Sequence, residues 1–270
     1  MLEIENLTKT FGTQTVISDI SMTLVSGKIY GLVGRNGSGK TMLMKMILGF
    51  VSPSSGSIKI EGKVLGKDIS MPDRIGAIIE NPGFLPEYSG FKNLKFLAMI
   101  HHKISNEEIR NAMRIVGLDP DSKKHVGKYS LGMRQRLGIA QAIMEDPDIL
   151  LLDEPTNYLD AEHIAWLTRY LQEYENAFIL ISHDIPFLND VVNIIYHMEN
   201  QRLDRYVGNY DKFQEVYAVK KSQLEAAYRK QQQEISELKD FVARNKARVA
   251  TRNMAMSRQK KLDKMDVIEL

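Results

Sequence analysis

The sequence Gly34-Arg-Asn-Gly-Ser-Gly-Lys-Thr41 fits the pattern G-x-x-x-x-G-K-[ST]. It follows an apolar run, Ile29–Val33, and precedes a run with helix-forming composition, Met42–Leu48. Strand, glycine loop and helix in this order are typical of a phosphate-binding loop, because glycines let backbone N–H groups turn toward phosphate oxygens and the helix N-terminus adds partial positive charge. The alternative is a glycine turn that only caps a helix. We expect nucleotide phosphates to contact Gly34, Arg35, Asn36, Gly37, Ser38, Gly39, Lys40 and Thr41.

Within this loop, Lys40 and Thr41 have distinct expected roles. The Lys40 ammonium would neutralise the β- and γ-phosphates, and the Thr41 hydroxyl would bind Mg²⁺. The pattern therefore predicts that ATP and Mg²⁺ bind here.

Two carboxylates end the apolar run Ile149-Leu-Leu-Leu-Asp153-Glu154. A buried central strand delivers acids to the C-terminal edge of a sheet in this way. Asp153 is expected to hold Mg²⁺, directly or through water, and Glu154 to polarise the water that attacks the γ-phosphate. Taken alone, the pair could equally be a strand end with solvated acids. A phosphate loop in the same chain favours an ATP hydrolase.

The rest of the pattern predicts an α/β fold. Helices are expected at 40–48, 91–100, 107–116 and 161–174, with a mostly helical stretch at about 82–147. Such a stretch indicates a helical subdomain set into an α/β core. Short β-rich runs predict strands at 2–7, 15–22, 29–33, 57–60, 148–152, 177–181 and 194–198.

A long helical arm is predicted after Gly208, where 62 residues contain neither glycine nor proline. Apolar positions step by alternating four and three residues from Leu224 to Val249, with polar interruptions at Gln231 and Asn245. This seam indicates a coiled coil or a helical hairpin. Lys239–Lys264 carries a local charge of +7, whereas the whole chain carries +2. An RNA contact and a solvated helix that only packs or dimerises both fit this charge.

Composition excludes several classes of protein. The chain has no cysteine, so it has neither a disulfide framework nor a Cys-ligated metal. It has no apolar run of about 18 residues, and its start lacks the apolar stretch of a signal peptide. We expect a cytoplasmic protein, or one peripheral at the inner face of the membrane through a partner.

The sequence Tyr129-Ser-Leu-Gly-Met-Arg-Gln-Arg136 resembles the signature of ATP-binding cassette (ABC) proteins. Ser130 lies 90 residues after Lys40 and 23 before Asp153, as in that family. The resemblance covers about residues 1–205. It implies an ABC cassette of the P-loop NTPase class, which has a RecA-like core, an antiparallel β subdomain and a helical subdomain, here followed by the arm at 206–270.

Further site residues follow from the resemblance. His183 lies at the place of the switch histidine and would act with Glu154 in catalysis. The family forms a head-to-tail pair of cassettes, homodimeric or with a paralogue, in which each ATP lies between the phosphate loop of one and the signature of the other. The matching positions imply nucleotide contacts from Phe11, Glu80, Ser130, Gly132 and Asp160.

Three positions depart from the common family pattern. Leu131 and Met133 replace the usual Gly and Gln of the signature, and Glu80 replaces the Gln of the glutamine loop. Both departures occur in cassettes similar to exporters of antimicrobial peptides. The first 156 residues accordingly look most like the ATP-binding subunit of such an exporter, whose partner would be a membrane-spanning permease.

The C-terminal part has a different likeness. Residues 241–252 resemble the linker between the two cassettes of ABC-F proteins, which are soluble ATPases that act on ribosomes. An ABC-F-like fragment would contact the ribosome or tRNA through the basic arm. The two functions stay open at this point, with the exporter subunit preferred.

Overall fold

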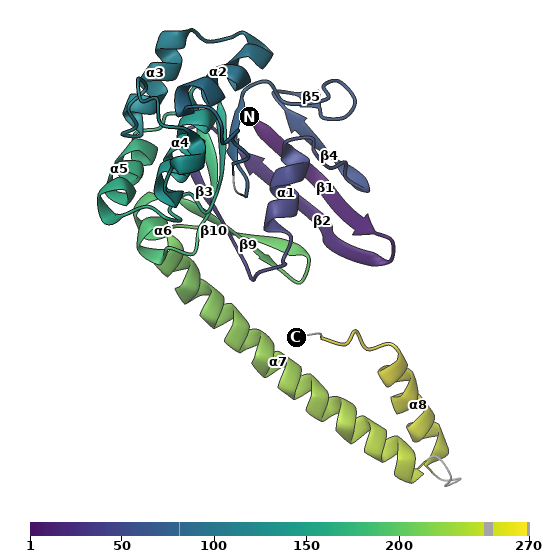
Figure 1. Ribbon diagram of the computed structural model, residues 1–270. Coiled ribbons are helices and arrows are strands. Elements are labelled where there is room, and N and C mark those ends of the chain that lie inside the picture. The colour runs from purple at the N-terminus through teal and green to yellow at the C-terminus, as the bar shows by residue number, and fades with distance from the viewer. Residues whose placement is uncertain (81, 246–250, 269–270) are drawn as a thin grey trace. The chain divides into compact units, whose positions relative to one another are not determined.

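The computed structural model describes residues 1–80, 82–245 and 251–268 (Figure 1). Contacts divide the chain into two compact units, Met1–Asp211 and Lys212–Leu270. The first unit contains two sheets and most of the helices, and the second is helical. Each unit is described by itself.

The smaller sheet of the first unit is antiparallel and has the strand order β2-β1-β4-β5. Its strands alternate buried and more exposed side chains, as expected for a sheet with one face on a core. Gly56 turns β4 close to β1, since a Cβ there would lie 2.3 Å from the carbonyl oxygen of Asn6. The strands are β1 (Leu2–Phe11), β2 (Gln14–Leu24), β4 (Ser55–Ile60) and β5 (Lys63–Val64).

The larger sheet carries the order β10-β9-β3-β8-β7-β6 and is parallel except for β10, which runs antiparallel to β9. Its central strands β3 and β8 are apolar and buried throughout, as expected for strands that are covered on both faces. Two of its strands, β6 and β10, were not expected from the sequence. The strands are β3 (Ile29–Val33), β6 (Ile75–Ile78), β7 (Ile149–Asp153), β8 (Ala177–Ile181), β9 (Ile194–Glu199) and β10 (Arg202–Val207).

Side-chain caps begin five of the helices in this unit. Each capping serine or aspartate accepts a hydrogen bond from a backbone N–H in the first turn. The helices are α1 (Lys40–Ile47), α2 (Gly90–His101), α3 (Asn106–Ile115), the 3₁₀ turn η1 (Val126–Lys128), α4 (Leu131–Ile143), α5 (Ala161–Gln172) and α6 (Ile185–Val191). The expected α/β cassette with a helical segment, α2 to α4, is confirmed.

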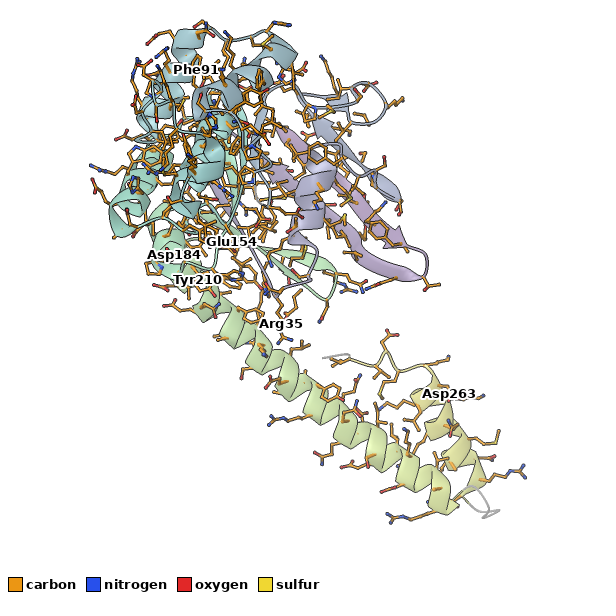
Figure 2. All side chains as sticks on the ribbon, in the orientation of Figure 1. Arg35, Phe91, Glu154, Asp184, Tyr210 and Asp263 are labelled. Carbon is orange, nitrogen blue, oxygen red and sulfur yellow. The ribbon has the colours of Figure 1, made fainter. Side chains whose placement is uncertain are left out.

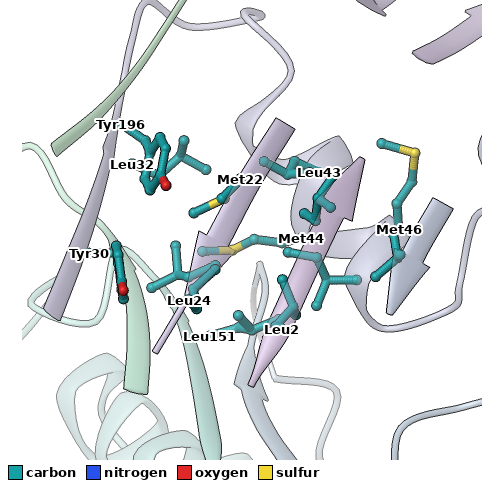
Figure 3. Close-up of a cluster of buried hydrophobic side chains, with 14 of the residues drawn as sticks. Leu2, Met22, Leu24, Tyr30, Leu32, Leu43, Met44, Met46, Leu151 and Tyr196 are labelled. Atoms are coloured by element: carbon teal, nitrogen blue, oxygen red, sulfur yellow. The ribbon is translucent and has the colours of Figure 1, made fainter. Parts of the chain in front are cut away.

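Helix α1 lies in the main hydrophobic core, between residues of both sheets (Figure 3). Leu43 and Met44 of α1 are fully buried among Leu2 and Leu24 of the antiparallel sheet and Leu151 of the parallel sheet. Burial of such side chains stabilises the unit by about 1.5–3 kcal/mol each. The core thus fixes the helix that follows the phosphate loop against the strand that carries the two acids.

The second unit is a helical hairpin. It contains α7 (Tyr210–Asn245) from Lys212 onward and α8 (Arg252–Asp263), which packs against α7. Lys261 Nζ lies 2.6 Å from Glu234 Oε1, and the Arg258 guanidinium lies 3.5 Å from the centre of the Phe241 ring. From Tyr228 to Asn245 the predicted seam residues are the less exposed face of α7: Tyr228, Gln231, Ile235, Leu238, Val242 and Asn245. Leu224 is exposed, and Val249 lies outside the described residues.

None of the helices in the described ranges combines the length and the apolar composition that a bilayer crossing requires.

Candidate functional site

The glycine loop joins β3 to α1 in a conformation that needs its glycines. Gly39 precedes α1 with φ +104°, in the left-handed region. Gly34 has φ +154°, and a Cβ there would lie 2.3 Å from the carbonyl oxygen of Met198 on β9. Larger residues would therefore change both the backbone and its contact with the sheet.

Lys40 folds back over this loop. Its Nζ donates to the carbonyl oxygens of Gly34, at 2.7 Å, and Arg35, at 2.9 Å. The side chain is buried, and burial lowers the pKa of Lys40 while the nearby charges of Asp153 and Glu154 oppose this effect. A buried ammonium among carbonyl groups is a cation prepared for anionic oxygens.

Thr41 and Asp153 connect α1 to the end of β7. The Thr41 hydroxyl donates to Asp153 Oδ2 at 3.1 Å. Burial raises the pKa of Asp153, and the hydrogen bond from Thr41 and the charge of Lys40 act against this rise. A hydroxyl beside a carboxylate is a donor set that suits Mg²⁺.

Glu154 occupies a strained position directly after β7. Its φ is +49°, its N–H donates to the Ile181 carbonyl at 2.8 Å, and the His183 N–H donates to Glu154 Oε2 at 3.2 Å. Oε1 is buried and has no hydrogen-bond partner among the described residues, although His183 Nε2 is 3.4 Å away. Figure 2 labels Glu154, which directly follows β7, and Asp184, which caps α6. An unpartnered carboxylate oxygen here can accept a proton or bind water.

The environment of Glu154 also changes its acidity. Burial raises its pKa, the hydrogen bond and charge of His183 oppose the rise, and the charge of Asp153 adds to it. By contrast, the exposed carboxylates of Glu5 and Glu108 have lowered pKa values, because Glu5 accepts a hydrogen bond from Lys59 and Glu108 from the backbone of Ser105. The two acids at the end of β7 are therefore unlike ordinary surface acids.

A cavity of 580 Å³ joins these groups. Ser38 Oγ is a second buried polar atom without a hydrogen-bond partner among the described residues. The glycine loop, Lys40 and the unpartnered Glu154 oxygen of this cavity fit a triphosphate with its cation. The cavity is lined by Val16, Asn36, Gly37, Gly39, Lys40, Thr41, Met42, Asp153, Glu154, Asn157, Ile181 and His183.

The predicted signature residues lie at the start of α4. Ser130 caps this helix by accepting from the Met133 N–H at 3.2 Å. Gly132 faces the segment after β7, since a Cβ there would lie 2.6 Å from the Tyr158 carbonyl oxygen. Neither residue lines the cavity of its own chain.

Of the predicted loop residues, Gly34, Arg35 and Ser38 do not line the cavity, and neither do three predicted residues outside the loop. Phe11, at the end of β1, is 49% exposed, with Lys9 Nζ 4.7 Å from its ring centre. Glu80 follows β6 and lies 2.7 Å from Lys45 Nζ. Asp160 caps α5 by accepting from the His163 N–H at 3.0 Å.

Gln135 is a site residue that the sequence did not predict. It is buried on α4, and its amide donates at 3.2 Å to the carbonyl oxygens of Glu154 and Pro155. It thus connects the signature helix to the backbone of the candidate base. The signal was its place inside the signature, but the direction of its side chain depends on how α4 packs.

A parallel sheet presents a phosphate loop and an acidic strand end at one cavity, and a helix with the signature sequence lies on the same sheet. These features define the class of P-loop nucleotide-binding proteins. A solved structure of the ATP-binding subunit of an ABC transporter has the same fold. It has a TM-score of 0.72 at 24% identity and covers 81% of this chain and 93% of the other.

Comparison with known sequences gives the family. A family model described as ABC transporter matches residues 17–157, and a second with the same description matches residues 196–270. The chain belongs to the ABC transporter family, and its first unit is the cassette of an ABC-type ATPase. The predicted class of enzyme is thereby confirmed.

Two relatives are similar to different lengths of this chain. An uncharacterized ABC transporter ATP-binding protein, YfmM of Bacillus subtilis (strain 168), is 47% identical over all of this chain, which spans 58% of that relative. The bacitracin transport ATP-binding protein BcrA of Enterococcus faecalis is 38% identical over 75% of this chain and 68% of the relative.

Proposed function

We propose that this chain binds Mg·ATP at the phosphate loop and hydrolyses it, as the ATP-binding subunit of an exporter-type ABC transporter. The cassette would span residues 1–205, with its helical subdomain at about 82–147 and the arm following it. The observation that carries the hydrolytic part is the buried, unpartnered Oε1 of Glu154 in the same cavity as Lys40 and Thr41.

Binding of the phosphates follows from the positions of the loop atoms. Lys40 Nζ would exchange the carbonyl oxygens of Gly34 and Arg35 for phosphate oxygens. The backbone N–H groups at the start of α1 would receive the same oxygens. Mg²⁺, held by Thr41 and Asp153, would neutralise charge between the phosphates. Phe11 would stack on the adenine with the face of its ring that Lys9 leaves free.

Glu154 is proposed as the general base. Its Oε1 would accept a hydrogen bond from the attacking water and then the proton that this water loses. The left-handed backbone and the N–H of His183 hold its carboxylate in place. The raised pKa makes it a better proton acceptor than an exposed glutamate. His183, whose side chain is 66% exposed, would contact the γ-phosphate.

Hydrolysis is proposed to need a second cassette. Ser130, Gly132 and Asp160 do not line the cavity of their own chain, so they can serve the nucleotide of a partner. Leu131 and Tyr158 beside them are more than half exposed. A head-to-tail pair satisfies this reciprocity with one two-fold axis.

The coupled process is proposed to be export through a separate membrane-spanning permease, with the chain cytoplasmic and peripheral to the membrane. BcrA is named for bacitracin transport, and the similarity to it extends over three quarters of this chain. Glu80, in place of the usual Gln, lies next to the helical subdomain that would contact the permease.

Nucleotide binding and turnover of the isolated protein test the enzymatic part. We expect Lys40→Ala to abolish Mg·ATP binding, because it removes the buried cation of the loop. Glu154→Gln should retain binding and reduce turnover by at least roughly 100-fold, because the amide cannot accept the proton. Lys63→Met, a change of charge on β5, is the control. Unchanged hydrolysis by Glu154→Gln would show that another group is the base.

The arm is the basis of a second, less favoured candidate function, that of a ribosome-associated ATPase. YfmM, named as an ABC transporter ATP-binding protein, is similar over the whole of this chain including the arm, whereas BcrA matches three quarters of it. The arm also concentrates positive charge, and Arg244 and Arg252 are exposed on its two helices. Charge of this kind suits phosphate contacts with RNA.

Co-sedimentation of the Glu154→Gln protein with ribosomes in ATP separates the two candidates. Binding at physiological salt that is lost on changing Arg244 and Arg252 to Gln, and retained on changing Lys63 and Lys67 to Gln, would favour the ribosome. The exporter proposal predicts no such binding, and instead nucleotide-dependent association with a permease.

A further inference from the structure

Two contacts attach α1 to the ends of neighbouring strands. Thr41 and Lys45 lie one turn apart on the same face of this helix. The Thr41 hydroxyl donates to Asp153 Oδ2 at 3.1 Å, and Lys45 Nζ donates to Glu80 Oε1 at 2.7 Å. Thus α1 contacts two acids one turn apart: Asp153, which is proposed to hold Mg²⁺ with Thr41, and Glu80, which pairs with Lys45.

Strand pairing explains why both acids lie next to α1. Strands β6 and β7 are adjacent, with Ile78 paired to Leu152. Asp153 ends β7 and Glu80 lies just beyond β6, so both acids emerge at the same edge of the sheet. Glu80 has φ +61°, a conformation that a residue with a Cβ rarely adopts. The ion pair with Lys45 helps to hold the Glu80 carboxylate against α1.

The charges of the site give the ion pair a role beyond folding. Lys45 is 32% exposed and Glu80 63% exposed, and ion pairs of this exposure contribute little to stability. Glu80 is, however, close to the site: Lys45 binds it one turn of α1 after Thr41, and the paired strands β6 and β7 bring it to the same sheet edge as Asp153. Without Lys45, the uncompensated charge of Glu80 would add to those of Asp153 and Glu154 beside the bound phosphates.

We infer that Lys45 is a positioning residue of the nucleotide site, which holds Glu80 against α1 and neutralises it so that Mg·ATP binds without repulsion from a third carboxylate. The inference rests on the proposed function. It assigns a role to a residue that lies outside the phosphate loop, and it explains how this cassette accommodates an acid where Gln is usual. Lys45 acts through Glu80 and not by touching the nucleotide.

A double-mutant cycle on the full chain tests this inference. The dissociation constant of a fluorescent ATP analogue with Mg²⁺ is measured for the unsubstituted protein, Lys45→Met, Glu80→Gln and the double variant. We expect Lys45→Met to weaken binding roughly 5- to 20-fold at low salt, and less at high salt. The double variant should bind within about twofold of Glu80→Gln, because no uncompensated carboxylate remains.

Two further variants separate positioning from folding. Lys45→Arg keeps the cation and should restore binding to within about threefold of the unsubstituted protein. Lys63→Met, which removes an exposed lysine on β5, should leave binding unchanged. Thermal melting of each variant identifies any that unfold, and Lys45→Arg then gives the comparison in a folded protein.

The binding measurements distinguish failure of the role proposed for Lys45 from failure of the proposed nucleotide binding. If Lys45→Met weakens binding by the same factor in the unsubstituted protein and in the Glu80→Gln variant, or does not weaken it, Lys45 does not act through Glu80 and the inference is wrong. If the unsubstituted protein binds no nucleotide, the proposed function fails and this inference fails with it.

Discussion

Individual carboxylates in this cassette differ according to burial. Two exposed acids with hydrogen-bond partners, Glu5 and Glu108, have lowered pKa values, whereas burial raises the pKa of Asp153 and Glu154. Glu154 also keeps one oxygen without a hydrogen-bond partner among the described residues. The ionised carboxylates of Asp153 and Glu154, which the proposed chemistry needs, therefore destabilise the folded protein when no nucleotide is bound.

This conflict predicts that Glu154→Gln raises the melting temperature of the empty protein at neutral pH, by about 1–3 °C. The folded-state pKa of Glu154 lies above its ordinary value of 4.5, so its ionised form destabilises the fold above that raised pKa. The difference between the two proteins should shrink as the pH falls toward 4.5. Melting curves from pH 8 to pH 5 measure it. A difference that is constant across this range would contradict the assigned cause.

Local motifs made part of the site predictable from the sequence. Lys40, Thr41 and the acids after Ile149–Leu152 could be placed because each lies at a fixed distance from a strand or a helix start. Partners such as Lys45 for Glu80 could not, because they depend on which strand ends lie under α1. The roles of the signature residues stay predictions, since they concern a second cassette.

At the scale of elements, the contact between α4 and β6 holds the signature helix on the sheet. Gly76 of β6 makes this contact: a Cβ there would lie 1.9 Å from the Ala142 carbonyl oxygen. The same glycine helps to explain why β6 was missed from the sequence, since glycine weakens the strand pattern of a four-residue run. Strand β10 was missed because charged residues interrupt it.

We expect Gly76→Ala to lower the melting temperature by roughly 3–10 °C, because the backbone of α4 would have to move away from the sheet. Gly83→Ala is the matched control, since a Cβ at Gly83 meets nothing within 4 Å. Thermal unfolding of both variants provides the measurement. Equal effects of the two substitutions would mean that α4 does not pack on β6 as described.

The hairpin of the second unit gives a separate prediction. Ala255 of α8 is 1% exposed, whereas Ser257 of the same helix is exposed. Ala255→Arg should open the hairpin and increase hydrogen exchange in residues 252–263, because the long side chain does not fit between the helices. Ser257→Arg adds the same charge and should leave exchange unchanged. Equal protection in both variants would argue against the hairpin in solution.

For the whole molecule, the distribution of site residues predicts nucleotide-dependent dimerisation. With Mg·ATP, Glu154→Gln should elute at twice the mass of the monomer, because the bound nucleotide completes the interface with Ser130 of a second cassette and is not hydrolysed. The added substitution Lys40→Ala should abolish the dimer. Light scattering after size exclusion measures both. A dimer that forms without nucleotide would indicate pairing through the arm.

The architecture as a whole was more predictable than its boundaries. Strand, loop and helix patterns gave the α/β class, and the signature gave the cassette, because these features are local or have fixed spacing. The seam after Gly208 indicated the buried face of α7 from Tyr228 onward. It could not choose between a partner chain and α8, because either could cover the same apolar face.

The lysine of the phosphate loop has a consequence for the energetics of the whole cycle. Since two of the three Nζ–H groups of Lys40 already donate to carbonyl oxygens of its loop, phosphate oxygens would largely replace acceptors that this lysine already has. A diphosphate can take part in this exchange almost as well as a triphosphate. ADP should therefore compete strongly for the loop, and in the proposed dimer a preference for ATP would arise where the second cassette contacts the γ-phosphate. Product release, and with it the ratio of ATP to ADP in the cell, would then set the pace of turnover.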